Sequence, residues 1–393
     1  MTRPEAPREG ALADRWLIAI LVLAALALRW HGIGYGLPEV YEEAYPFKIA
    51  WRMWGWGPDR AFDPNPHWFK YPGLTIELQL LGQALLFLAL RIAGAIHSTV
   101  DFRILHELDP TAFYLTGRGI TALLGAATVI PVFLLARRAA GRGAAIAAGL
   151  LVAVNPGLIA KSQVIEVDVP LTLLVAASLL AAVRLAERLT WGRIVAAGAL
   201  VGLAAGAKYP GIVLAVPMVL AIVMAARRTP ESRSRAPRSG KRGSAAPGRP
   251  NPALGAVSSI SVFALVVIAA LFVTSPYLFL DSGSAMRDLA VEGEHMRLGH
   301  FGADLGPTWL SYLRDWPLRV AGIPVAIASL SGLVWFTLRR EKWAVILAGF
   351  VVAYAVLVSS FAMKADRYLL PLLPAAFVFA GALAADLCGR VRA

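Results

Sequence analysis

Two groups of carboxylates in this sequence could take part in acid–base chemistry. Glu42 and Glu43 are adjacent, while Glu166 and Asp168 stand two positions apart just before Pro170. A carboxylate beside a hydroxyl group can accept its proton, and it can also ligate a metal ion. An ordinary acidic loop is the alternative explanation for the first pair. Asp168, with Pro170 in the first turn of a following helix, would equally suit an N-cap.

Four basic residues could bind an anionic group. Two of them precede a Tyr-Pro dipeptide, and a third lies inside an apolar run, where a cation needs a partner or a water-filled cavity. A single cation near a membrane surface is more often an anchor that reaches the interface. Four on one predicted face favour a receptor for an anionic head group. The four are Lys70, Arg118, Lys208 and Arg367, and Tyr71 and Tyr368 are neighbouring candidates.

The sequence contains no recognisable metal-ligand spacing. The acidic segment 277–317 includes His295 and His300, which are weak candidates because type and spacing must both fit a metal. Cys388 is the single cysteine, which excludes an intrachain disulfide and a cysteine-based metal cluster. P-loop, dinucleotide-binding and His-Glu-x-x-His motifs are absent. The metal content of any site is therefore unknown at this stage.

Long apolar segments must position these residues. The chain of 393 residues is 58% hydrophobic and 16% charged, whereas about a quarter of the residues in a soluble domain are charged. Runs of about 20 apolar residues span a bilayer as helices, because backbone groups cannot remain unpaired in lipid. We therefore predict an all-α, polytopic transmembrane bundle that forms one domain over residues 1–393. About ten spans are expected, at 14–31, 113–136, 143–160, 168–187, 193–207, 210–226, 254–276, 318–338, 343–361 and 367–388.

Basic residues in short loops mark the cytoplasmic side of a membrane protein. Their positions predict cytoplasmic chain termini in the plasma membrane and an active site that faces outside. Residues 227–253 contain eight Arg or Lys, one Glu and five Pro, which predicts a disordered basic cytoplasmic loop near anionic lipid. This loop localises much of the net charge of +13. The expected partner is therefore the lipid bilayer, and no nucleic acid is expected.

The same alternation of basic loops places two large loops outside, at 32–112 and 277–317. The segment 74–96 is long enough to span, but a crossing there would turn every later basic loop outward. We predict that it lies along the outer interface, so that the first loop contains interface helices. The alternative is that 193–207 is not a span. The apolar run 16–28 resembles a signal peptide, but we expect an uncleaved first span because many more follow.

The order of these motifs resembles the GT-C superfamily of membrane glycosyltransferases. The resemblance is to the branch of protein O-mannosyltransferases and aminoarabinose transferases (glycosyltransferase family 39-like). An acidic pair follows the first span, then Phe69-Lys70-Tyr71-Pro72, and an arginine opens the next span. Later come a polar run that ends in Asp-x-Pro and an Arg-Tyr-Leu-Leu-Pro sequence. The likeness extends over nearly the whole chain.

The resemblance implies inverting transfer of a hexosyl or pentosyl group from a polyprenyl-phosphate-linked sugar donor. The acceptor would be a lipid, glycan or protein at the extracytoplasmic face. Glu42 occupies the family's catalytic Asp position and would be the general base, with Glu43 and Asp168 as further catalytic carboxylates. Lys70 and Arg367 match cations near the donor phosphate. No cofactor is certain, and a divalent metal stays open.

Two other functions compete with this one. A lipid or solute transporter, such as a flippase, would place buried charges across the bundle midplane and repeat its halves. Here the polar residues gather on one face, and no half-to-half repeat is evident. A non-catalytic membrane protein with the GT-C fold is the second alternative, because Glu42 replaces the family's Asp and a fold does not imply a function. The retained carboxylates favour the enzyme.

Overall fold

The computed structural model describes residues 6–38, 45–56, 61–234, 252–299 and 306–391, and every regular element within them is helical. The first half contains α1 (Ala6–Trp30), α2 (Tyr45–Met53), α3 (Gly73–Ile92), α4 (Thr99–Leu108), α5 (Thr111–Ala127), α6 (Val129–Val154), α7 (Pro156–Ser162), α8 (Asp168–Glu187) and α9 (Trp191–Ala207). The second half contains α10 (Ala215–Ser234), α11 (Pro252–Thr274), α12 (Tyr277–Leu280), α13 (Ser282–Leu298), α14 (Thr308–Asp315), α15 (Ile323–Leu338), α16 (Lys342–Ser359) and α17 (Leu373–Val391). Short 3-10 segments cover Tyr209–Leu214 and Asp366–Leu372, and a π-helical turn covers Trp316–Val320.

Apolar helices occupy all the segments predicted as spans, which confirms the polytopic helical fold. Within the part of the chain that the structure describes, seven helical stretches can cross a membrane by length and composition, and α9 and α15 are shorter apolar helices. α9, the least certain of the predicted spans, packs against both α8 and α11. The seven stretches are Gly73–Ile92, Thr111–Val154, Asp168–Glu187, Tyr209–Arg227, Gly255–Thr274, Lys342–Ser359 and Asp366–Val391.

The longest of these stretches, with 44 residues, is a helical hairpin. The helical backbone breaks at Ala140 (φ −143°) and at Gly141 (φ +89°, ψ −171°). Glycine suits this turn because a side chain would strain a backbone with positive φ. Beyond the turn the chain runs back along α6, and a Cβ at Gly149 would lie 3.4 Å from the Phe133 ring. The predicted pair of spans at 113–136 and 143–160 therefore folds back on itself.

Ion pairs fix the basic turn of this hairpin. Arg137 Nε lies 3.0 Å from Asp14 Oδ2, and Arg142 Nε lies 3.2 Å from Asp14 Oδ1, so two arginines of the turn hold α1. Arg138 Nε lies 2.7 Å from Glu187 Oε1 at the end of α8. The basic residues used to predict the topology thus join three helices at one end of the bundle.

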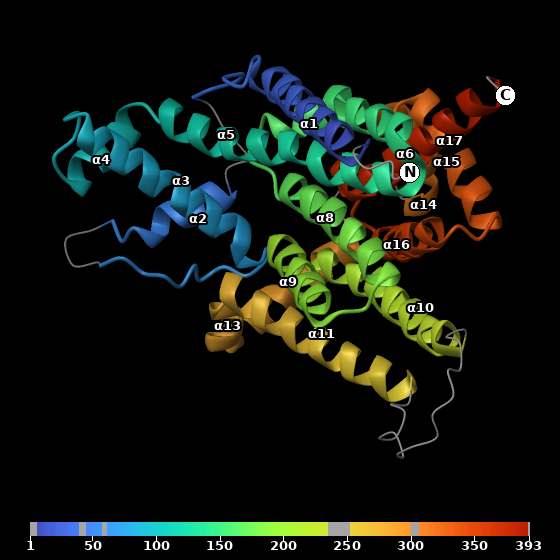
Figure 1. The fold of residues 1–393 in the computed structure, drawn as a ribbon. Helices are drawn as coiled ribbons and strands as arrows, with labels where there is room; N and C mark the ends of the chain where they lie inside the picture. Colours follow the sequence, from blue (N-terminus) through green and yellow to red (C-terminus); the bar gives the residue numbers. More distant parts are fainter. Residues whose placement is uncertain (1–5, 39–44, 57–60, 235–251, 300–305, 392–393) are drawn as a thin grey trace.

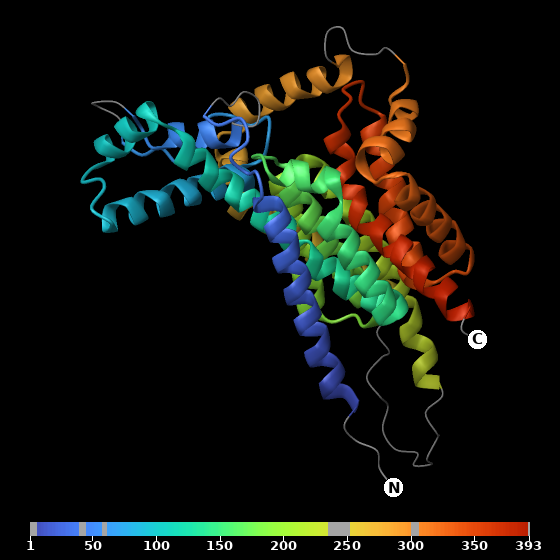
Figure 2. The ribbon, with the colours of Figure 1, turned by 90° about the horizontal axis from the view of Figure 1, so that it is seen from above.

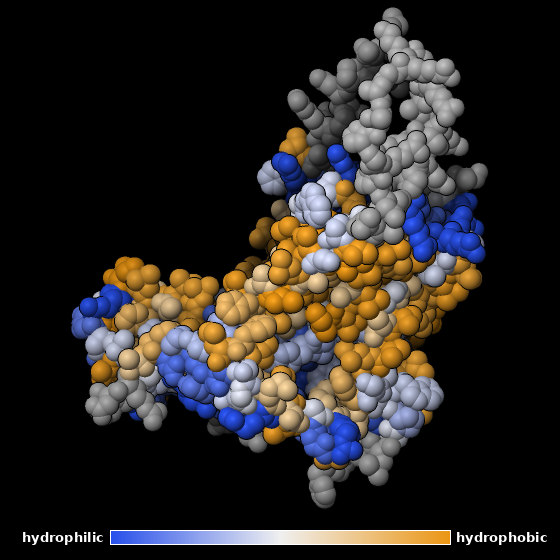
Figure 3. Space-filling view, turned by 90° about the horizontal axis from the view of Figure 1, so that it is seen from below, coloured by the Kyte–Doolittle hydropathy of each residue, from blue (hydrophilic) through white to orange (hydrophobic). Residues whose placement is uncertain are grey.

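The helices run back and forth between two ends of the molecule. The start of α1 and the last residues of α10 and α17 lie at one end, whereas α2, α4 and α13 lie at the other (Figures 1 and 2). Between the two ends, apolar side chains form a band on the surface, with hydrophilic residues on either side of it (Figure 3). A hydrophobic belt of this kind suits a chain that crosses a bilayer several times.

α3 and α4 project from the bundle beside α2 and the start of α5 (Figure 1). An aromatic cluster packs these helices together, and Phe102 and Phe113 are its buried centre, with ring centroids 4.9 Å apart. Only 28% of the apolar window of α3 is buried, although the helix is apolar enough to span. This arrangement agrees with helices in the first large loop, and the location of α3 relative to a bilayer stays a prediction.

Two polar residues of α3, Gln79 and Gln83, are buried. Gln83 Nε2 donates to the Phe47 carbonyl oxygen at 3.0 Å, and Gln83 Oε1 accepts from Trp54 Nε1 at 2.9 Å. Because both the nitrogen and the oxygen of this buried amide are hydrogen-bonded, Gln83 fixes α3 against α2 and the residue that follows it.

Arg29, near the end of α1, is fully buried. Its guanidinium donates to the carbonyl oxygens of Ala25 at 2.9 Å, Val152 at 2.9 Å and Ala153 at 3.2 Å, and Nε lies 3.3 Å from Ser162 Oγ. A buried cation is tolerated when such acceptors replace water. These bonds join α1 to the end of α6 and to α7.

Three predicted boundaries are wrong. The span expected at 318–338 begins at Ile323, because Gly322 (φ +85°) separates α15 from the preceding π-helical turn. The helix expected to continue to 160 ends at Val154, where Asn155 caps the separate helix α7 by accepting from the Leu158 N–H. The predicted loop at 227–253 is helical through Ser234, and α11 begins at Pro252. Residues 235–251 of that loop lie outside the described residues.

Candidate active site

A buried ion pair lies where α8 begins and α9 ends. Lys208 Nζ contacts both carboxylate oxygens of Asp168, at 2.7 and 2.8 Å. The Asp168 side chain is fully buried and that of Lys208 is 10% exposed. The residue that caps α8 is Val167, without a side-chain bond, so the interpretation of Asp168 as an N-cap is wrong. Its carboxylate instead balances the charge of Lys208, because neither ion would be stable alone in this environment.

A second, more accessible ion pair lies beside the first. Arg367 Nη1 is 3.5 Å from Glu166 Oε1, and the Arg367 side chain is 25% exposed. Burial raises the pKa of Glu166, and the positive charges of Arg367 and Lys161 oppose this rise. Arg367 is therefore more accessible to an incoming anion than Lys208, whose side chain is 10% exposed.

Tyr368 connects the two ion pairs. Its ring centroid lies 4.2 Å from Lys208 Nζ and 5.8 Å from the Arg367 guanidinium carbon. Cations attract the face of an aromatic ring, most strongly where water is excluded. Tyr71 also faces this charge, because Arg367, Tyr368, Asp168 and Glu166 all influence its phenol, whose pKa burial raises well above its usual value.

Segment 63–73 reaches the site from the first large loop. The Phe69 carbonyl oxygen accepts from the Tyr209 hydroxyl at 2.7 Å, and the Phe69 N–H donates to Asp288 Oδ2 at 2.7 Å. Gly73 N–H donates to Ser275 Oγ at 2.8 Å. These bonds fix the main chain on both sides of Lys70. The half-buried Lys70 forms no ion pair with any residue that the structure describes.

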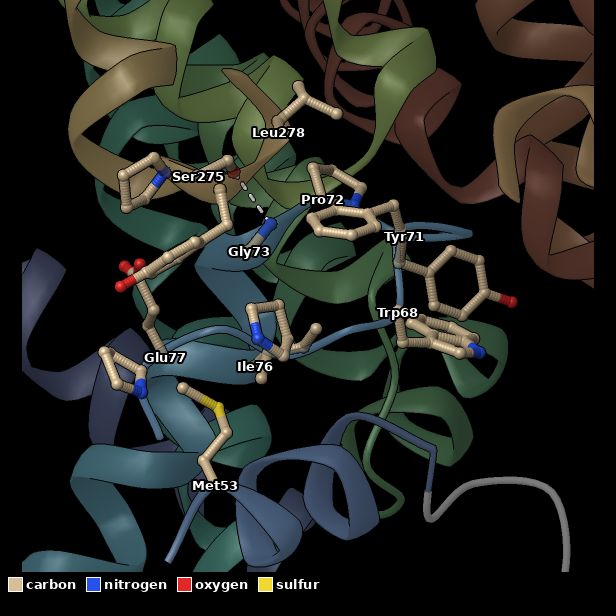
Figure 4. Close-up of a pocket in the computed structure, with 14 residues that line it drawn as sticks. Met53, Trp68, Tyr71, Pro72, Gly73, Ile76, Glu77, Ser275 and Leu278 are labelled. Carbon is tan, nitrogen blue, oxygen red and sulfur yellow. Dashed lines mark hydrogen bonds between the residues drawn. The ribbon is translucent and has the colours of Figure 1, made fainter. Parts of the chain in front are cut away.

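A small pocket lies behind this segment, between it and the start of α3 (Figure 4). Figure 4 shows Glu77, Ile76 and Met53 on one side and Trp68 beside Tyr71 on the other. The ring centroids of Trp68 and Tyr71 are 5.3 Å apart in an edge-on arrangement. The Tyr71 hydroxyl points away from Gly73 and Glu77 (Figure 4).

Of the remaining predicted residues, the structure describes Arg118 and His295. Glu42, Glu43 and His300 lie outside the described residues. Arg118 is buried in α5, where Nη1 donates to the carbonyl oxygens of Ile33 at 2.7 Å and Tyr35 at 2.6 Å. It holds the chain that leaves α1. His295 lies half-buried on α13, one residue before Met296, whose Sδ is 3.9 Å from the Tyr368 hydroxyl oxygen.

Several residues near the site escaped the sequence analysis. Lys161 Nζ lies 3.9 Å from Asp366 Oδ1, which joins the end of α7 to the start of the last helical segment. Tyr312 of α14 is buried, and its hydroxyl oxygen accepts from the Ala365 N–H at 3.5 Å. Lys161 stands five positions before Glu166, and Asp366 directly precedes Arg367, so proximity to a predicted residue was a signal for these two. Tyr312 has no predicted residue near it in the sequence. Among the described residues, no group of three His, Cys, Asp or Glu could hold a metal ion.

Comparison with known proteins gives one family match and several structural matches. Residues 115–237 match the family of dolichyl-phosphate-mannose-protein mannosyltransferases. No curated protein sequence gives a significant match.

The structure is similar to ArnT from Cupriavidus metallidurans bound to undecaprenyl phosphate, with a TM-score of 0.60 and 18% identity over 94% of this chain and 60% of that one. It is also similar to the apo oligosaccharyltransferase of Archaeoglobus fulgidus, with a TM-score of 0.57 and 14% identity over 96% of this chain and 51% of that one. AglB from the same organism, in complex with an inhibitory peptide and a dolichol-phosphate, has a TM-score of 0.56 and 13% identity over 96% and 51% of the two chains.

This chain therefore corresponds to between about half and about three fifths of the length of these larger proteins. At such low identity the matches establish a common fold. The predicted resemblance is confirmed at that level, and the chain is a multi-pass membrane protein with the helical fold of the GT-C glycosyltransferases, similar over residues 115–237 to the protein mannosyltransferases.

Proposed function

We propose that this chain is a glycosyltransferase that moves a sugar from a polyprenyl-phosphate-linked donor to an acceptor on the extracytoplasmic face. The observation that carries the proposal is the cluster of Asp168, Lys208, Glu166, Arg367 and Tyr368. It draws residues from three distant parts of the sequence to one end of the bundle. ArnT bound to undecaprenyl phosphate and AglB bound to dolichol-phosphate share the fold, which supports a donor of this class.

The reaction is a direct displacement with inversion. A hydroxyl oxygen of the acceptor attacks the anomeric carbon while the bond from that carbon to the phosphate oxygen breaks. The phosphate keeps the electron pair, and the hydroxyl proton passes to a carboxylate base. Fixed cations stabilise the negative charge that grows on the leaving phosphate without moving during the reaction.

The two ion pairs suit different tasks in this reaction. Both oxygens of Asp168 already accept from Lys208, so this carboxylate is the less suitable base and a better holder of the site's geometry. Glu42 therefore stays our candidate base, with Glu43 to orient it or the acceptor. Arg367 has exposed surface and a carboxylate partner at 3.5 Å, a contact that a phosphate can replace. We assign the donor phosphate to Arg367 and Lys70, with Lys208 in a supporting position, whereas Arg118 holds the chain that follows α1.

A transfer assay with a donor panel tests this function. Purified protein in detergent micelles is incubated with radiolabelled polyprenyl-phosphate hexoses and pentoses and a membrane extract as the acceptor source. We expect label to move from one donor into an acceptor. If no donor is consumed while reconstituted protein moves the lipid-linked sugar across vesicles, the transporter interpretation replaces this one.

Two substitutions then test the assigned phosphate contacts. Lys70→Ala and Arg367→Ala should each raise the apparent KM for the donor by roughly tenfold or more, because each removes a charge-assisted bond. The matched control is Arg103→Ala. Arg103 is an exposed arginine of α4, outside the cluster, whose Nε lies 2.8 Å from Glu107 Oε1. An unchanged donor KM in both variants would remove these two residues from the donor site.

A further inference from the structure

A groove lies at the other end of the bundle from the candidate active site. Its walls come from the α5–α6 hairpin, α8 and α9, and it encloses about 720 Å³, within the range of typical ligand pockets. Apolar side chains line most of it, among them Ile130, Leu173, Ala177 and Leu200. It is open on one side, so an apolar molecule can enter it from the membrane.

Three arginines line the groove near the basic turn. They are Arg138, Arg184 and Arg193, from the hairpin, α8 and α9 respectively. Arg138 pairs with Glu187, whereas Arg184 and Arg193 form no ion pair within the described parts of the chain. Arg193 Nη1 donates to the carbonyl oxygens of Arg184 and Arg188 instead. One carboxylate for three guanidinium groups leaves a net positive charge at the end of an apolar groove.

The dimensions of the groove match one leaflet of a bilayer. Arg184 follows Leu173 by eleven positions along α8, which corresponds to about 16 Å at a rise of 1.5 Å per residue. Half of the hydrocarbon core of a bilayer is about 15 Å thick. A chain that lies along the groove from the arginines inward would therefore end near the middle of the bilayer.

We propose that this arginine-rimmed groove binds an anionic glycerophospholipid. The lipid would come from the leaflet at the end of the bundle where α1 begins and α17 ends. The phosphate would contact Arg184 and Arg138 at the rim, and one acyl chain would lie between α8 and α9. A basic loop that only orients the protein needs arginines but does not need an apolar groove beneath them. Basic pockets between transmembrane helices are known to suit anionic head groups. The site is separate from the cluster at Asp168, and it does not depend on the proposed transfer reaction.

Lipid competition measured by native mass spectrometry tests the site. The full-length protein in detergent is mixed with equal amounts of phosphatidylglycerol and phosphatidylcholine that carry identical acyl chains. We expect the wild-type protein to retain phosphatidylglycerol. Arg138→Gln/Arg184→Gln should reduce that preference by roughly tenfold or more, because charge-assisted bonds to the phosphate are lost.

Two further variants test the contribution of the apolar groove separately from that of the arginine charges. Ala181→Trp fills the groove without changing a charge and should also abolish the retained lipid. Arg390→Gln is the matched control and should bind like the wild type, because Arg390 pairs with Asp386 at 3.1 Å and lies near the same end but does not line the groove. Size-exclusion profiles and unfolding temperatures establish that each variant is folded.

Several results would overturn the proposal. Equal retention of the two lipids by the wild type would remove the charge selectivity. Retention by Ala181→Trp together with loss in the arginine variant would mean that the head group binds at the surface and the groove is not used. Displacement of phosphatidylglycerol by an equal concentration of inorganic phosphate would mean that the acyl chain contributes nothing to the binding affinity.

Discussion

At the scale of single residues, the proposed reaction needs a carboxylate as its general base, and Glu42 is the first candidate to test. Glu42→Gln keeps the size of the side chain but removes its basicity. We expect turnover to fall by about 10²–10⁴-fold, the usual contribution of a positioned base, with little change in donor affinity. Glu43→Gln and Asp168→Asn are measured beside it in the same transfer assay. If Glu42→Gln keeps near-normal turnover while one of the others does not, that residue becomes the base.

The pair of Asp168 and Lys208 is open to a double-mutant cycle. Removing one partner leaves a buried charge alone, which costs about 3–5 kcal/mol of stability. Asp168→Asn and Lys208→Met should therefore each lower the unfolding temperature in detergent, and the double variant should lose much less than the sum of the two. Arg103→Ala serves as the exposed control. Strictly additive losses would mean that the two charges do not depend on one another.

Sequence reasoning identified both partners of this pair but not their contact. Asp168 and Lys208 are 40 positions apart, and Glu166 and Arg367 are 201 positions apart. No periodicity connects residues over such distances, because their contact depends on how whole helices pack. Arg29 escaped attention for the same reason, since it reads as a snorkelling residue at the end of a span until the carbonyl groups of α6 are placed around it.

At the scale of elements, close packing of α9 against α11 sets the position of Lys208. Gly198, Gly202 and Gly206 recur every four residues along α9 and face α11, where small residues let two helices approach closely. A Cβ at Gly202 would lie 2.6 Å from both the Ala270 Cβ and the Val267 carbonyl oxygen. Since α9 ends one residue before Lys208, its position sets that of the ion pair.

Gly202→Ala should therefore lower stability by about 1–3 kcal/mol, the usual cost of overpacking, and reduce transfer as Lys208 shifts. Unfolding temperature and turnover are the measurements. Gly192→Ala makes the same change on the same helix, where a Cβ meets nothing within 4 Å, and should be neutral. Equal unfolding temperatures for the two variants would contradict close α9–α11 packing as the restraint on Lys208.

Helix boundaries show what sequence patterns can and cannot predict. Apolar runs located the helices of the bundle, because burial in lipid selects long apolar segments whatever their neighbours are. The same runs did not show where Gly322 interrupts a helix, because a positive φ leaves no trace in hydropathy. The apolar run placed the start of α8 correctly at Asp168, but it could not decide whether this residue is an N-cap or a functional carboxylate, because the two look alike in a sequence.

The orientation of the whole molecule can be tested by cysteine labelling. In a Cys388→Ser background, Arg60→Cys and Val100→Cys should both react with an impermeant thiol reagent in intact cells, since the alternation of basic loops places 32–112 outside. Gly240→Cys should react only after the cells are permeabilised. Labelling at position 60 with protection at position 100 would mean that α3 crosses the membrane and that our assignment of sides is wrong beyond that point.

The contacts of Arg29 have a consequence for biogenesis. Its acceptors on α6 and α7 stand 123–133 positions later in the sequence. At a synthesis rate of about 5–20 residues per second, roughly 6–27 s pass between translation of Arg29 and translation of those acceptors. During that interval the Ala25 carbonyl oxygen of α1 is the one final acceptor already made, so the guanidinium cannot sit deeply in the hydrocarbon. The first helix must therefore wait near the translocon or the membrane surface, and its docking is timed by the arrival of the second half of α6.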